Sequence, residues 1–85
     1  MRIDKFLKVS RVIKRRQVAK DACAGGRVEI NGKVAKPGSE VEAGDVVAIR
    51  FASGVFRFEV LRVAEHVRKE EAETMVRILE GHDEE

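Results

Sequence analysis

Eight lysine and arginine residues fall within the first twenty positions of the chain, against a single acidic residue, Asp4. They are Arg2, Lys5, Lys8, Arg11, Lys14, Arg15, Arg16 and Lys20. This segment carries a formal charge of +7, whereas residues 21–85 carry −5. A charge run is most often a solvated face, but an ordinary surface mixes both signs. The one-sided distribution instead predicts binding to the phosphates of a nucleic acid.

The position of three of these cations strengthens that prediction. Lys14, Arg15 and Arg16 fall in the first turn of a helix expected over residues 14–24. The positive end of a helix dipole makes each cation there unfavourable by about 0.3–1 kcal/mol. A bound phosphate would remove this cost, because free amide groups and arginine side chains both attract anions. We therefore expect the segment to bind a nucleic-acid backbone.

The aromatic residues favour folded RNA over single strands as the ligand. The chain has four phenylalanines and no tryptophan or tyrosine. Phe6, Phe56 and Phe58 are already needed on apolar faces of the expected elements, which leaves few rings to stack on splayed bases. Recognition of RNA shape and phosphate fits this composition better.

No other group of residues predicts catalysis, a metal or a cofactor. Cys23 lies among small apolar residues of the expected helix, where a packed thiol is the usual role. His66 and His82 lack partner ligands at metal-binding spacing. Asp45 follows Gly44 and is explained by turn formation. We expect a binding protein that is not an enzyme.

The elements that must position the cations can be read from periodicity. Helices are expected over residues 2–9, 14–24 and 69–80, a hairpin over 27–35, and strands over 46–51 and 55–63. The hairpin turns at Asn31-Gly32, a pair that suits a type I′ turn. The pattern predicts an α+β fold with one domain over residues 1–80, followed by an acidic, frayed tail at 81–85.

Four ordered motifs closely resemble the S4 RNA-binding domain. They are Arg2 to Leu7, Lys14 to Lys20, Gly26 to Lys33, and Gly44-Asp45. The resemblance implies two N-terminal helices packed on a small, mostly antiparallel sheet, which is the alpha-L RNA-binding motif, here with a short C-terminal helix. By matching position it adds Asp4 and Lys33 as RNA contacts and supports Arg2, Lys14, Arg15 and Arg16. Many members have serine or threonine where Arg15 stands, so this chain lacks a capping hydroxyl there.

The expected RNA-binding set combines the charge pattern with this resemblance. It comprises Arg2, Asp4, Lys5, Lys8, Arg11, Lys14, Arg15, Arg16, Lys20 and Lys33. The full-length pattern further resembles stand-alone bacterial members that bind stalled large ribosomal subunits. This implies large-subunit rRNA and peptidyl-tRNA as ligands. It also implies ribosome-associated quality control as the role, with a partner factor that tails stalled chains.

Three other functions remain open from the sequence. The same resemblance fits a heat-shock-type factor that recycles dissociated large subunits. The domain also occurs as an accessory to modifying enzymes, although this chain shows no modifying domain. A protein-interaction module using the acidic C-terminal face is a third possibility. The single cysteine and the lack of a long apolar run predict a cytoplasmic protein without membrane attachment, and we expect a monomer off the ribosome.

Overall fold

The computed structural model describes residues 1–81 and contains two α-helices, a 3₁₀ helix and a five-stranded sheet. The elements in order are α1 (Ile3–Val9), α2 (Arg16–Ala24), β1 (Val28–Ile30), β2 (Lys33–Val34), β3 (Val46–Phe51), β4 (Gly54–Val60), η1 (Lys69–Met75) and β5 (Val76–Glu80). The α+β class is confirmed. Of the tail expected at 81–85, only Gly81 lies within the described residues. No helix in residues 1–81 is long and apolar enough to cross a membrane.

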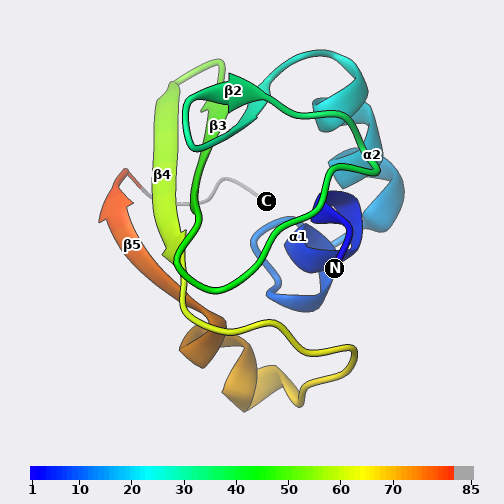
Figure 1. Cartoon of the computed structure of the whole chain (residues 1–85), viewed down its shortest axis with the longest axis vertical. Coiled ribbons are helices and arrows are strands. Elements are labelled where there is room, and N and C mark those ends of the chain that lie inside the picture. Colours follow the sequence, from blue (N-terminus) through cyan, green and yellow to red (C-terminus); the bar gives the residue numbers. More distant parts are fainter. Residues whose placement is uncertain (82–85) are drawn as a thin grey trace.

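The sheet is antiparallel throughout, with strand order β2-β1-β3-β4-β5 (Figure 1). The expected hairpin is confirmed, because Asn31 and Gly32 both have positive φ, at 52° and 84°, as a type I′ turn requires. Ile30 pairs with Lys33 across this turn. Asp45 has the structural role expected of it, since its carboxylate accepts hydrogen bonds from the Glu42 backbone and the Asn31 side chain.

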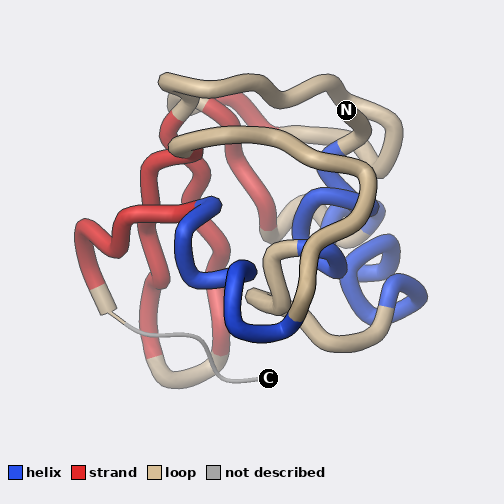
Figure 2. Tube along the Cα trace, turned by 90° about the horizontal axis from the view of Figure 1, so that it is seen from below, coloured by secondary structure: helices blue, strands red, loops and turns tan. Residues whose placement is uncertain are grey.

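The two α-helices lie together beside the sheet, and the hydrophobic core fills the space between them (Figures 1 and 2). Ile3, Phe6 and Leu7 are fully buried on α1, as the helical spacing predicts. The Phe6 ring stacks on Phe58 of β4 at a centroid distance of 6.2 Å. Phe56 adjoins Phe58 at 5.4 Å. These rings join the cationic helix to the sheet, and so give the N-terminal segment a rigid base.

The ends of both helices follow from local sequence. Ser10 ends α1, and Arg11 then adopts a left-handed conformation with φ of 64°, which turns the chain toward α2. Gly25 and Gly26 end α2, and Gly26 has φ of 76°, a conformation that glycine adopts at little cost. The α2 helix begins at Arg16, two residues later than expected.

The C-terminal region corrects one expectation. A helix was expected over residues 69–80, but η1 ends at Met75 and the chain continues as strand β5. Val76 and Ile78 pair with Val60 and Phe58 on one face of the sheet, while Arg77 pairs with Glu59. Apolar and charged residues alternate over residues 76–78, as in a strand. Ala72, Met75, Val76 and Leu79 have the spacing of a helix instead. Pairing with the exposed edge of β4 decides between them.

Candidate nucleic-acid interface

Asp4 lies at the centre of the N-terminal site and is almost completely buried, with 1% of its side chain exposed. Its carboxylate accepts hydrogen bonds from Arg2 at 3.0 and 3.2 Å and a longer one from Arg16 at 3.5 Å. A buried carboxylate cannot contact RNA directly. The expected contact role of Asp4 is therefore corrected: it positions two arginines, each about half exposed.

Backbone contacts hold this carboxylate in place. The amide of Ile3 donates to the carbonyl of Ser39 at 2.7 Å, and the amide of Asp4 donates to that of Pro37 at 3.3 Å. The loop between β2 and β3 thereby satisfies amides at the start of α1, which no side chain caps. The start of α1 is fixed to the loop, and the guanidinium groups share a fixed anchor.

Arg2, Asp4 and Arg16, together with Gln17 and Lys20, line a shallow hollow of about 240 Å³, and we call these five residues the Asp4 cluster. Lys20 is four residues after Arg16, so both lie on one face of α2. Three cations and one buried acid thus line the same open hollow. Arginine donors arranged in this way suit the oxygens of a phosphate.

Three further expected residues form a separate group. Lys8, Arg11 and Lys14 line a second hollow of about 220 Å³ with Val9, Glu65, His66 and Val67, and we call this the Arg11 notch. The segment that contributes Glu65 to Val67 comes from between β4 and η1, far away in sequence. The sequence predicts no metal-binding role for His66, and the structure places it in this hollow. No local signal could have placed it beside these cations.

Lys5 is engaged within the protein. Its ammonium group forms an ion pair with Glu65. The hydrogen bond from Lys5, together with its charge, holds the pKa of Glu65 below the usual range. This pair links α1 to the segment that follows β4, so Lys5 presents less unbalanced charge than the sequence alone indicates.

Lys33 and Cys23 lie away from both groups. Lys33 is exposed on β2, in the hairpin, and lines neither hollow. Cys23 is buried, as expected. Burial, and then the charge of Asp4, raise the pKa of its thiol to about 11, so the reactive thiolate is scarce at neutral pH. Among residues 1–81, no group of three or more His, Cys, Asp or Glu residues could hold a metal.

The start of α2 lacks the features that usually stabilise a helix. Arg15 is the N-cap residue with φ −111° and ψ 127°, and no side chain caps the helix. Its first turn contains no acid. Arg15 therefore meets the positive end of the dipole without an ion pair to any described residue, whereas Arg16 shares the charge of Asp4. Lys14, which was expected in the first turn, lies before the N-cap residue.

Replacing Arg15 by serine should stabilise the protein without ligand and weaken its binding to RNA. A hydroxyl N-cap contributes about 0.5–2 kcal/mol, and the adverse interaction with the dipole is lost. Thermal melting measures the first effect and titration of an RNA hairpin at fixed salt the second. Arg15→Ala is the matched control, because it removes the charge without supplying a cap. An Arg15→Ser variant that melts lower and binds RNA equally well would contradict this account.

Comparison with known proteins identifies the family of this chain. The family model described as the S4 domain matches residues 1–47. An RQC P-site tRNA stabilizing factor from Halalkalibacterium halodurans is 53% identical over 78 residues, covering 92% of this chain and 89% of that protein. The factor of the same name from Bacillus subtilis is 47% identical over 79 residues, covering 93% and 92%.

A solved structure shares the fold. Heat Shock Protein 15 of Vibrio cholerae, described as trimeric, superposes with a TM-score of 0.85 at 30% identity, covering 93% of this chain and 81% of that one. The S4 match takes in both α-helices, the hairpin and the loop that anchors α1. These are the elements that build the Asp4 cluster. The chain therefore belongs to the S4 domain family and, within it, to the family of RQC P-site tRNA stabilizing factors (RqcP).

Proposed function

We propose that this protein binds RNA through the Asp4 cluster and the Arg11 notch while it is associated with the large ribosomal subunit. The observation that carries the proposal is the pair of half-exposed guanidinium groups held by buried Asp4. Because they are anchored before any ligand arrives, less side-chain entropy is lost on binding phosphate. The protein acts by binding and not by catalysis.

The names of the relatives supply the biological setting of this proposal. They are called P-site tRNA stabilizing factors of RQC. In this setting the protein holds peptidyl-tRNA on an obstructed large subunit and contacts its rRNA, while a partner factor directs C-terminal tailing of the stalled chain. It works in the cytoplasm. Off the ribosome it is a monomer, and size-exclusion chromatography of the purified protein checks this oligomeric state.

Replacement of a single arginine of the Asp4 cluster tests the proposed RNA-binding surface. Arg16→Ala should weaken pelleting with purified large subunits by about ten-fold or more, because a hydrogen bond to a charged group contributes roughly 1.5–3 kcal/mol. Arg57→Ala is the matched control: Arg57 pairs with Glu80 across β4 and β5 and lines neither hollow. Circular dichroism verifies that both variants fold. Equal losses would show that the surface is assigned to the wrong face.

A second role is favoured by the likeness to Heat Shock Protein 15. In that role the protein would recycle dissociated large subunits that carry peptidyl-tRNA. Deletion of the gene separates the two roles. Loss of C-terminal tails on stalled chains supports quality control, whereas accumulation of dissociated subunits with tails intact supports recycling. A module that used only its acidic face would show no salt-sensitive association with RNA in either case.

A further inference from the structure

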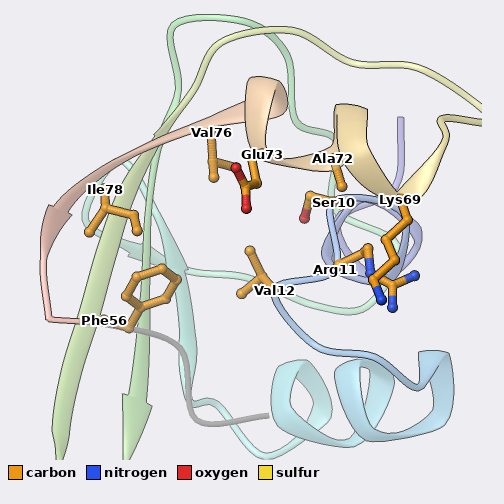
Figure 3. Close-up of a pocket in the computed structure, with 9 residues that line it drawn as sticks. All are labelled: Ser10, Arg11, Val12, Phe56, Lys69, Ala72, Glu73, Val76 and Ile78. Carbon is orange, nitrogen blue, oxygen red and sulfur yellow. The ribbon is translucent and has the colours of Figure 1, made fainter.

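A larger pocket shares Arg11 with the notch. It has a volume of about 480 Å³, within the range of small-ligand sites, and lies between the end of α1, η1 and the paired strands β4 and β5 (Figure 3). Its lining residues are Ser10, Arg11, Val12, Phe56, Lys69, Ala72, Glu73, Val76 and Ile78. We call it the Phe56 pocket. The RNA surface proposed above does not use it.

The lining divides into an apolar part and a charged end. Val76 and Ile78 supply the accessible apolar surface, and Ile78 is 58% exposed although it is large and apolar, whereas Val12 and Phe56 line the pocket as buried side chains. Arg11 and Lys69 lie together at the opposite end in Figure 3. Neither forms an ion pair with any described residue. Two cations close together without an acid between them favour a bound anion.

Glu73 adds a hydrogen-bond acceptor. Its carboxylate is directed toward the middle of the pocket in Figure 3, between the apolar part and the cations. A planar group with an amino substituent could therefore pack on the apolar residues and donate to Glu73. A phosphate attached to that group would reach Arg11 and Lys69. An unstacked nucleotide has all three features.

We propose that the Phe56 pocket takes one unstacked, amino-bearing nucleobase of the bound RNA, with its phosphate on Arg11 and Lys69. Arg11 lines both this pocket and the Arg11 notch, so one RNA backbone can pass from the notch to the pocket without leaving the cationic surface. An apolar peptide would match the apolar part of the pocket but not Arg11 and Lys69. This inference rests on the proposed RNA-binding function and adds a site that contacts a base.

Neighbouring residues of β5 give a matched pair of variants. Ile78→Trp places a bulky ring over the pocket from an exposed position, whereas Leu79→Trp makes the same change at the next residue, which is 48% exposed and does not line the pocket. Blocking the pocket should weaken binding of hexaadenylate several-fold, because the base loses its apolar contacts, while the Leu79 variant should bind like the parent. Glu73→Gln should reduce the preference for hexaadenylate over hexauridylate.

Methyl NMR locates the ligand directly. Hexaadenylate should shift the methyl resonances of Val12, Val76 and Ile78, and an abasic ribose-phosphate hexamer should not. Unmoved methyl groups, equal shifts with the abasic hexamer, or full affinity in Ile78→Trp would each overturn the pocket proposal. Any of these outcomes would leave a protein as the alternative occupant of the pocket. Arg16→Ala distinguishes a failure of the pocket proposal from a failure of the proposed RNA-binding function. If it still weakens large-subunit pelleting while the pocket variants have no effect, only the pocket proposal is wrong.

Discussion

Raising the salt concentration from about 50 to about 200 mM should weaken RNA binding by roughly 60-fold to 1000-fold. Each phosphate contact releases condensed counterions, which contributes about 0.7–0.9 to the slope of log affinity against log salt. Four to six contacts therefore predict a slope of roughly −3 to −5. Fluorescence anisotropy of a labelled RNA hairpin over a salt series measures it. A flat profile would rule out a binding energy dominated by phosphate.

The structure sharpens this expectation by separating the cations. Arg2 and Arg16 share the charge of Asp4, and Lys5 is paired with Glu65. The remaining cations of the two hollows have no ion pair among residues 1–81: they are Lys8, Arg11, Lys14 and Lys20.

Single lysine variants test this separation. Lys8→Ala should make the slope shallower by about one contact, while Lys36→Ala, in the exposed loop after β2, should leave it unchanged. The opposite pattern would move the RNA surface to the hairpin side of the molecule.

Features of the fold that depend on neighbouring residues could be predicted from sequence. The Asn31-Gly32 turn needs two residues that tolerate positive φ, and both have it. Phe56, Phe58 and Val60 alternate and are buried together. The one-sided charge of residues 1–20 likewise requires no knowledge of the fold. These signals are local, and the structure preserves them.

The arrangement of the site depended on contacts between distant residues. Helical spacing puts Asp4 on the side of α1 away from the apolar residues Phe6 and Leu7. The residue is nevertheless buried, because Arg16 approaches from α2 and the backbone of Pro37 and Ser39 contacts the first turn of α1. The pairing of Lys5 with Glu65 joins residues sixty positions apart. No periodicity encodes such pairs. The sequence therefore predicts a cationic N-terminal surface, but not which of its residues hold the others in place.

The strand β5 shows a different limit. Ala72, Met75, Val76 and Leu79 fit helical spacing, while Val76 and Ile78 fit strand spacing. Two patterns of similar strength overlap on five residues. Pairing with β4, which no single-segment pattern contains, selects the strand. The same pairing brings Ile78 to the edge of the Phe56 pocket, so that pocket could not be predicted before the strand was known.

The role of Asp4 leads to the second large expected effect. Asp4→Asn keeps the size of the side chain but removes the charge that Arg2 and Arg16 share. The free energy of unfolding should fall by about 1.5–3 kcal/mol, the contribution of hydrogen bonds to a charged group. RNA binding should weaken by about ten-fold or more, because the two guanidinium groups lose their common anchor and must be ordered by the ligand.

The direction of this change separates positioning from simple charge. Removing an acid makes the protein more positive, so long-range electrostatics alone predicts tighter binding. Asp21→Asn is the matched control, since it makes the same change in net charge at an exposed position of α2, where Asp21 accepts a hydrogen bond from Gln17 at 2.9 Å. Urea unfolding and RNA titration of both variants are compared at one salt concentration. We expect the Asp21 variant to bind RNA as tightly as the parent or slightly more tightly, and the Asp4 variant to bind more weakly. Tighter binding by both variants would mean that Asp4 acts only as a charge, and that the arginines orient themselves without it.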